Sequence, residues 1–286
     1  MGYPDLWFTC GMSLFVASLN SGSNGNCYYI GNHTEAILID AGISCRETEK
    51  RLKRLGLSLR HVKAIFVTHE HADHVYGIPS ILKKHKVPIY ITTRTLLKSR
   101  LRNTKAYHFK PYEPVSIGGL TIRAFPVLHD ATDPHNFIVS NGQVNVGVFT
   151  DIGNLTTHVV QHFKQCHAAI LESNYDDQLL ETGSYPLPLK NRIRGGHGHL
   201  SNDQAAKLFY DHRPAFMTHL FLGHLSKNNN SPRIVQKLFD GISNGTEIVV
   251  ASRYKETSLY TIDGRPRAQP RPQYKEVAFS GQLKLF

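Results

Sequence analysis

Cysteine is scarce in this chain of 286 residues, and the few cysteines present exclude two kinds of site. The chain has four, and no two of them form a Cys-x-x-Cys pair. This pattern predicts neither a thiolate metal site nor a disulfide framework, and it favours reduced thiols in a cytoplasmic protein. The four are Cys10, Cys27, Cys45 and Cys166.

Long hydrophobic runs are also missing. No apolar stretch approaches the roughly 20 residues that a membrane-spanning helix needs, so we expect no membrane partner. The first eleven residues contain neither a basic region nor a long apolar core, and we expect no secretory signal there. Acidic residues are outnumbered, with 22 Asp and Glu against 33 Lys and Arg. This excess favours polyanionic partners, because phosphate contacts release counterions.

Histidine, in contrast, is abundant, and its distribution points to metal chemistry. Three imidazoles and the carboxylate of Asp73 lie within residues 69–74, just after the apolar run 64–67. That run predicts a buried strand, so the cluster lies on the loop leaving it, where α/β proteins place their chemistry. Because residues i and i+2 of an extended segment point the same way, we expect His69 and His71 to bind one metal ion. Asp73 and His74 then turn toward a second ion. The alternative, a run of ordinary surface polar residues, is disfavoured by this spacing.

Hydrophobic periodicity predicts an α/β protein in which strands alternate with helices in each half of the chain. Strands are expected over 13–19, 27–30, 36–40, 64–67, 87–91, 120–128, 136–140, 144–150, 168–172, 216–222, 247–251 and 258–262. Helices are expected over 47–55, 75–85, 95–101, 155–163, 202–211 and 232–239. This order suggests two mixed sheets packed face to face with helices outside, an αββα four-layer sandwich. We expect residues 1–12 to be an extension, 13–262 a single folded domain and 263–286 a flexible tail.

Three more potential ligands follow predicted strands. His129 follows the strand over 120–128, Asp151 follows the strand over 144–150, and His224 follows the strand over 216–222. A single histidine or aspartate at a strand end is usually structural. The same pattern of a core strand followed by a ligand recurs along the chain, and this recurrence favours a shared metal centre.

With these residues, the chain resembles the metallo-β-lactamase-fold hydrolases over about residues 13–262. The specific motif is His-x-His-x-Asp-His at 69–74. The resemblance implies one metal held by His69, His71 and His129, and another held by Asp73, His74 and His224. It also implies that Asp151 bridges the two metals and that Asp40 supports the metal loop from behind, which is a sensible role for a carboxylate that orients imidazoles. The ligands suit Zn²⁺, and also Mn²⁺ or Fe²⁺.

Finer features resemble the YycJ (WalJ) type within that family. They are Ser-Gly-Ser-x-Gly-Asn at 21–26, Gly-His-Leu-Ser-Asn at 198–202 and Leu-Gly-His-Leu-Ser-Lys at 222–227. The resemblance implies DNA exonuclease activity. Glu172 and His199 resemble the glutamate–histidine pair that ribonuclease Z-like phosphodiesterases use near the leaving group. The alternative for these two residues is an exposed loop glutamate and a residue that flanks a helix cap.

The ligand set predicts a hydrolase that uses a metal-bridging hydroxide, oriented or deprotonated by Asp73, with His199 as general acid. The main expectation is a phosphodiesterase that acts on nucleic acid, and specifically a DNA exonuclease. The alternative is a small-molecule hydrolase for a cyclic phosphodiester, thioester or lactone, and a third reading is a metal-stabilised binding protein without turnover. We expect Arg192 and Arg194 to contact phosphates near the mouth of the site.

The end of the sequence carries a separate motif. Gln282, Leu283, Leu285 and Phe286 match the Gln-Leu-x-Leu-Phe peptide by which bacterial DNA-processing enzymes bind the replication sliding clamp. An Arg- and Pro-rich stretch precedes them and cannot build a core. The motif predicts clamp binding. The alternative is a tail docked on its own domain.

Overall fold

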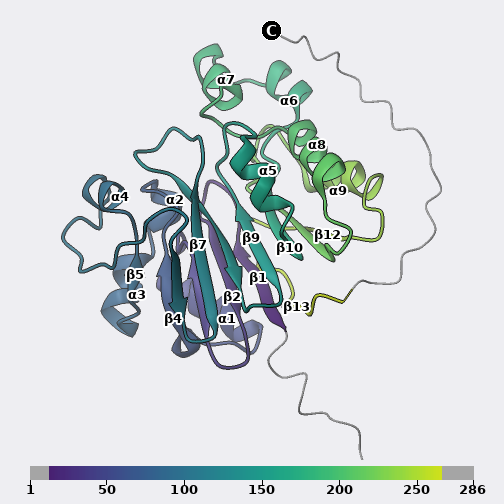
Figure 1. Ribbon diagram of the computed structural model, residues 1–286. Coiled ribbons are helices and arrows are strands. Elements are labelled where there is room, and N and C mark those ends of the chain that lie inside the picture. The colour runs from purple at the N-terminus through teal and green to yellow at the C-terminus, as the bar shows by residue number, and fades with distance from the viewer. Residues whose placement is uncertain (1–12, 266–286) are drawn as a thin grey trace, which may run out of the picture.

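The computed structural model describes residues 13–265, which fold into two β-sheets packed face to face between two layers of helices (Figure 1). The predicted αββα four-layer sandwich is therefore confirmed. The predicted extension over 1–12 and most of the predicted tail lie outside the described residues. Residues 282–286, with the clamp motif, are among them.

The first sheet has six strands in the order β13-β1-β2-β3-β4-β5. Strands β3, β4 and β5 are parallel to one another, and the other neighbours are antiparallel. The strands are β1 (Leu14–Asn20), β2 (Cys27–Gly31), β3 (Ala36–Ile39), β4 (Val62–Phe66), β5 (Ile89–Tyr90) and β13 (Tyr260–Ile262).

The second sheet has seven strands in the order β12-β11-β10-β9-β8-β7-β6. Strands β9 to β12 are parallel, whereas β6, β7 and β8 form an antiparallel meander that joins β9. The strands are β6 (Pro114–Ile117), β7 (Leu120–Pro126), β8 (His135–Ser140), β9 (Asn145–Phe149), β10 (Ala168–Glu172), β11 (His219–Gly223) and β12 (Glu247–Val250).

Helices cover the outer faces of both sheets (Figure 1). Helices α1 and α3 lie on the first sheet, and α5, α8 and α9 lie on the second. The helices are α1 (Cys45–Arg54), the 3-10 helix η1 (Leu59–His61), α2 (Ala72–Val75), α3 (Ile78–His85), α4 (Thr93–Lys98), α5 (Thr157–Phe163), α6 (Asp177–Thr182), α7 (Leu187–Arg194), α8 (Asn202–His212) and α9 (Pro232–Asp240). None of these helices in the described part of the chain is long and apolar enough to cross a membrane.

Alternation along the central strands produces separate hydrophobic cores. In β10, Ala168 and Ile170 face the core between the sheets, whereas Ala169 and Leu171 face the core under the outer helices. Successive side chains of a strand point to opposite faces, so a strand that is buried on both sides reads as a continuous apolar run. This is why the strands before the candidate ligands were recognisable from the sequence.

One predicted helix was wrong in its extent. The segment predicted as a single helix over 75–85 forms two helices, α2 and α3, which are separated near Gly77. The Gly77 N–H donates to the carbonyl of Ala41, and a Cβ at this position would lie 1.9 Å from the Ile43 carbonyl oxygen. The backbone of another loop therefore packs against this point, and only glycine allows that approach. Strand β6 and helices α6 and α7 were not predicted.

The parallel strands bring the candidate ligands to one edge of the sandwich. In the first sheet, Asp40 follows β3 and the histidine motif follows β4; in the second sheet, Asp151 follows β9 and Glu172 ends β10. His224 follows β11, which is the next parallel strand. The carboxyl ends of parallel strands meet at the same edge, so residues far apart in sequence become neighbours there.

Candidate metal centre and its supporting residues

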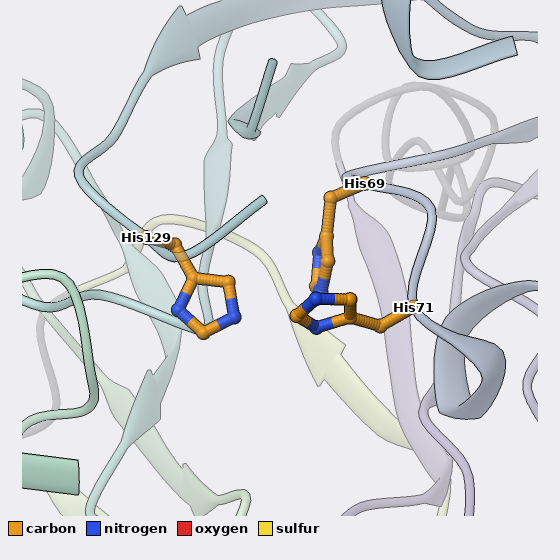
Figure 2. Close-up of side chains that lie close together, drawn as sticks. All are labelled: His69, His71 and His129. Carbon is orange, nitrogen blue, oxygen red and sulfur yellow. The ribbon is translucent and has the colours of Figure 1, made fainter. Parts of the chain in front are cut away.

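Three histidines from two segments form one half of the site. The ring nitrogens of His69, His71 and His129 lie within 4.8 Å of one another. Figure 2 shows their rings around a common space, with His129 on one side and His69 and His71 on the other. His69 and His129 are buried, and His71 is the N-cap of α2 and partly exposed. The structure thus brings together the three residues expected to hold one metal ion.

Asp73, His74 and His224 form the other half, and their ligand atoms also lie within 4.8 Å of one another. Asp73 Oδ2 is 3.5 Å from His74 Nε2 and 3.7 Å from His224 Nε2. Asp151 lies between the halves, with Oδ2 3.2 Å from His74 Nε2 and Oδ1 3.8 Å from His129 Nε2. This carboxylate is therefore placed as a bridge between the two groups.

Three of the site residues have left-handed backbone conformations. The φ angles are 58° at Asp40, 55° at Asp151 and 55° at His224. Each residue immediately follows or closely follows the end of a parallel strand, where the chain turns sharply. Side chains larger than glycine are uncommon in this region, although Asp and His are enriched among them. Such strain, of about 1–3 kcal/mol per residue, concentrates at functional sites.

Hydrogen bonds orient the imidazoles in one common way. The Nδ1–H of His129 donates to the carbonyl of Gly198 at 2.9 Å. The Nδ1–H of His74 donates to Asp40 Oδ2 at 2.7 Å, and the Nδ1–H of His224 donates to Glu172 Oε1 at 3.0 Å. Because these acceptors have no proton to give, Nδ1 must be the donor in each pair. The lone pair then lies on Nε2, which is the atom that faces the site.

His69 follows the same pattern through Thr68. The Thr68 hydroxyl donates to Asp40 Oδ2 at 2.8 Å, so its lone pairs are left to accept from His69 Nδ1 at 3.0 Å. The Thr68 N–H donates to Asp40 Oδ1 at 2.9 Å. Asp40 is fully buried. It supports two imidazoles, that of His74 directly and that of His69 through Thr68. This is the supporting position that the sequence resemblance implied for it.

Unpartnered nitrogens show that the donor set suits a metal ion. Among the described residues, His69 Nε2 and His129 Nε2 are buried and have no hydrogen-bond partner. A buried polar atom without a partner costs about 1–3 kcal/mol. Both atoms belong to the same three-histidine group, so a cation in that space would satisfy them together. Neutral imidazole and carboxylate ligands of this kind suit divalent transition metals.

The charges differ between the two halves. Burial and the charge of His74 lower the pKa of His69 well below its ordinary value. Burial also acts to lower the pKa of His224, but the attraction of Asp151 outweighs it and raises this pKa to about 10. The carboxylate-rich half thus favours a positive charge, which a proton or a metal ion can supply. Metal binding at this half requires the departure of a proton.

Glu172 is fully buried and connects two histidines. Its Oε1 accepts from His199 Nδ1 at 2.7 Å as well as from His224, and its Oε2 accepts from the N–H of Ile152 at 2.9 Å. Burial acts to raise the pKa of Glu172, but the charge of His199 and the bonds from both imidazoles lower it to about 2. Glu172 is therefore an ionised positioning residue. In turn, burial acts to lower the pKa of His199, but Glu172 raises it.

His199 lies close to two carboxylates of the site, those of Asp151 and Glu172. The ligand atoms of Asp151, Glu172, His199 and His224 fall within 4.8 Å of one another. His199 Nδ1 is 3.7 Å from Asp151 Oδ1, and the side chain is 22% exposed, unlike the enclosed His224. The histidine therefore stands at the open side of the centre, with Nδ1 held by Glu172 and Nε2 left for another group.

Sequence reasoning missed the residues that support the second half from the loop before β2. Asn26 Nδ2 lies 3.0 Å from His74 Nε2 and 3.2 Å from Asp73 Oδ2. The Tyr28 hydroxyl donates to Asn26 Oδ1 at 3.2 Å and lies 2.8 Å from Ser21 Oγ, which accepts from the N–H of His224 at 2.8 Å. In the sequence, this loop was informative only as a motif of the YycJ (WalJ) type, and nothing local shows that it reaches the ligands.

Close backbone contact holds the same loops together. The N–H of Asn26 donates to the Asp73 carbonyl at 2.7 Å, and the N–H of Ala41 donates to the His74 carbonyl at 2.9 Å. A Cβ at Gly42 would lie 1.7 Å from the Asp73 carbonyl oxygen. Glycine at this position therefore allows the ligand-bearing turn to pack directly on the chain after β3.

The two arginines expected to contact phosphates are already paired. Arg192 binds Asp130 at 2.5 Å, and Arg194 binds Glu181 at 2.8 Å. Uncompensated cations lie elsewhere, on α4 and the segment that follows it. The chain has no Asp or Glu between residues 77 and 112. The five basic side chains within residues 94–105 are exposed, and none of them pairs with a carboxylate of the described chain. They are Arg94, Lys98, Arg100, Arg102 and Lys105.

This fold, with its convergent imidazoles and carboxylates, defines a metal-dependent hydrolase of the metallo-β-lactamase fold. Residues 35–220 match the family described as "Beta-lactamase superfamily domain", and the chain belongs to that superfamily. The resemblance to the YycJ (WalJ) type that the sequence indicated is also confirmed.

Two curated relatives carry that resemblance. The chain is 31% identical over 230 residues to Exodeoxyribonuclease YycJ of Bacillus anthracis, an alignment that covers 79% of this chain and 87% of the relative. It is 28% identical over 219 residues to Exodeoxyribonuclease WalJ of Streptococcus pneumoniae, with 74% and 81% covered. Among solved structures, the metallo-beta-lactamase fold protein YhfI from Bacillus subtilis is similar, with a TM-score of 0.66 and 17% identity over 87% of this chain and 99% of that one. At that identity the likeness concerns the fold.

Proposed function

We propose that this protein is a dinuclear metal-dependent phosphodiesterase that acts on nucleic acid as a DNA exonuclease. The observation that carries the proposal is the convergence of imidazole Nε2 atoms in two groups with Asp151 between them. Two groups of ligands that share a carboxylate are the arrangement that two-metal hydrolases require. Zn²⁺ is the metal we expect, and Mn²⁺ or Fe²⁺ would fit the same donors.

Bound divalent ions supply two kinds of chemistry to such a site, a lowered pKa of water and neutralisation of charge on a phosphodiester. The side chains supply the proton transfers. Asp73 is 22% exposed at the side chain, whereas Asp151 is enclosed, and this difference supports Asp73 as the residue that orients the attacking water and accepts its proton. His199 is held at Nδ1 by Glu172, and its Nε2–H is the donor for the departing oxygen.

The substrate class rests on charge and on the relatives. Both curated relatives described above are named exodeoxyribonucleases. The basic segment adjoins the site, because Thr95 of α4 donates to the carbonyl of Asp133 at 3.2 Å. In the same loop, Thr132 donates its N–H to Glu70 within the ligand motif at 2.8 Å. A field of unpaired cations beside a metal centre suits a phosphate backbone better than an uncharged lactone.

Two finer parts of the proposal concern the setting of the enzyme. We place it in the cytoplasm, which agrees with Cys27, Cys45 and Cys166 being free thiols. We also assign sliding-clamp binding to residues 282–286. Their sequence supports this assignment, since two leucines and a phenylalanine can each contribute about 1.5–3 kcal/mol when buried in a pocket.

Degradation of end-labelled and circular DNA by the full chain, with Zn²⁺ or Mn²⁺, tests the proposal. We expect linear DNA to be shortened from an end, circular DNA to survive, and chelation to stop the reaction. Asp73→Asn is the matched inactive control, since it keeps the shape of the side chain and removes its charge. Turnover of an uncharged lactone without cleavage of any nucleic acid would replace the proposal with a small-molecule hydrolase.

A further inference from the structure

A pocket of about 170 Å³ opens next to the metal centre and has no role in the chemistry described above. The turn after β1 and the loops after β11 and β12 line it. Strand β12 is parallel to β11, so the pocket lies one strand further along the edge that carries His224. Neighbouring strands are about 4.8 Å apart, and Ser21, which lines the pocket, is bonded to the backbone of His224. A nucleic-acid strand bound at the metals would reach this pocket with an adjacent unit.

The charged side chains of the pocket are both positive. Lys227 and Arg253 line it, and no Asp or Glu is among the described residues that do so. Arg253 is partly buried, and its Nη2 donates to the carbonyl of Leu225 at 2.8 Å. Neither cation forms an ion pair within residues 13–265. Arg253 is therefore a fixed guanidinium whose charge no carboxylate balances, and such a group binds phosphate readily.

An aromatic side chain adjoins these cations. Tyr254 also lines the pocket and is 71% exposed. Its backbone is fixed on both sides, because its N–H donates to Ser252 Oγ at 3.1 Å and its carbonyl accepts from Arg51 at 3.1 Å. The ring is thus presented to solvent from a well-anchored segment. Nucleic-acid enzymes use such rings to stack bases without regard to sequence.

We propose that this pocket is a subsite for one nucleotide unit of the substrate strand. The phosphate lies between Lys227 and Arg253, the sugar contacts Leu225 and Ala251, and the base stacks on Tyr254. At about 170 Å³ the pocket holds the phosphate and the sugar of one unit, and the base lies outside this volume on the exposed ring of Tyr254. The inference rests on the proposed nuclease function and adds to it the place where the strand beside the scissile phosphate is held.

The test is a binding measurement on the full chain. A fluorescein-labelled single-stranded phosphorothioate DNA hexamer, which resists hydrolysis, is titrated with the metal-loaded chain, and the Kd is read by fluorescence anisotropy. Tyr254→Ala should weaken binding about tenfold, within the range of about 5- to 150-fold that loss of one base stack causes. Lys227→Ala should weaken binding and reduce its dependence on salt. Lys255→Ala is the matched control, since Lys255 is the exposed neighbour of Tyr254 but does not line the pocket.

Selective weakening by the two pocket variants, with Lys255→Ala within twofold of the parent chain, supports the subsite. Equal weakening by all three variants indicates general attraction to a basic surface and overturns it. Unchanged binding in the pocket variants, or no hexamer binding by the parent chain, overturns it as well. The nuclease function fails in a different experiment. If the parent chain cleaves no nucleic acid with any metal but the pocket variants still bind selectively less, the pocket stands as a nucleotide-binding site, its role as a substrate subsite is lost, and the nuclease assignment falls.

Discussion

Replacing Glu172 by Gln should weaken metal binding although this residue is not among the expected metal ligands. The carboxylate is buried and accepts hydrogen bonds at both oxygens, from backbone N–H groups at Oε2 and from two imidazoles at Oε1. In Glu172→Gln the amide oxygen is expected to remain toward the backbone donors. The NH₂ group then faces the Nδ1–H groups of His199 and His224, so donors oppose donors.

The magnitude follows from the tautomer of His224. To relieve the clash of donors, the Nδ1–H of His224 turns to Asp151 Oδ1, which is 3.1 Å away, or its proton moves to Nε2 and removes the lone pair that faces Asp73. Either change disturbs a metal-binding atom. Partners that orient metal-binding histidines are worth about 10- to 100-fold in metal affinity. We therefore expect a loss of about 1.4–2.8 kcal/mol in the free energy of metal binding, confined to the half of the site that contains His224.

Competition with a chelator and elemental analysis after dialysis measure this change directly. The expected result is loss of one of two bound ions, at chelator concentrations that leave the parent chain loaded. Glu256→Gln is the control, since Glu256 also accepts two hydrogen bonds from one partner, Arg54, but takes no part in the site. Metal affinity within twofold of the parent chain, together with unchanged turnover, refutes the reasoning. Unchanged affinity with reduced kcat shows instead that Glu172 acts through His199 alone.

Four further outcomes are expected. His69→Ala should abolish metal-dependent hydrolysis while the circular dichroism spectrum stays native, because the sheets do not depend on the ions. Hydrolysis by the variant at the parent rate, or by the parent chain without metal, would contradict this. His199→Ala should lower kcat by about 10²–10⁴ with metal content intact, and loss of an ion would make His199 a ligand instead. Reversing the charge of Lys98 and Arg102 should weaken DNA binding and make the slope of log K against log salt less steep than for the parent chain. A merely structural role would leave this slope unchanged. Deleting residues 282–286 should leave cleavage of short DNA unchanged and remove binding to a purified sliding clamp; equal binding by both forms, or by neither, argues against the clamp motif.

Most of the fold could be predicted because the strands are buried on both faces. Continuous apolar runs such as Ile37–Ile39 and Ala168–Leu171 are hard to misread, and each supplies side chains to two cores. The short elements gave weaker signals. Helix α7 buries none of its residues, and β6 is an exposed edge strand, so neither has the periodicity that burial imposes. The break between α2 and α3 depends on a contact with Ile43, more than thirty residues away.

The candidate ligands were also readable, since each follows a strand that was itself readable. Their partners were not. Asn26 contacts His74 across almost fifty positions, and Gly42 is needed only because the Asp73 carbonyl comes so close. The pairing of Arg192 with Asp130 could not be seen either, and the phosphate contact of Arg192 stays a prediction. Long-range contacts of this kind leave no periodic pattern in the chain.

By itself, the sequence determined the layered α/β class, the spacing of the histidine motif and the kinds of atom available to a metal, because these depend on local chemistry and on burial of whole strands. Only the tertiary structure decided which nitrogen of each imidazole faces the site, since that depends on acceptors such as Asp40, Gly198 and Glu172 brought from other strands and loops. It also decided that Lys227, Arg253 and Tyr254 share one pocket. Parallel strand pairing places the ends of distant segments side by side, and that proximity converts separate polar residues into a site.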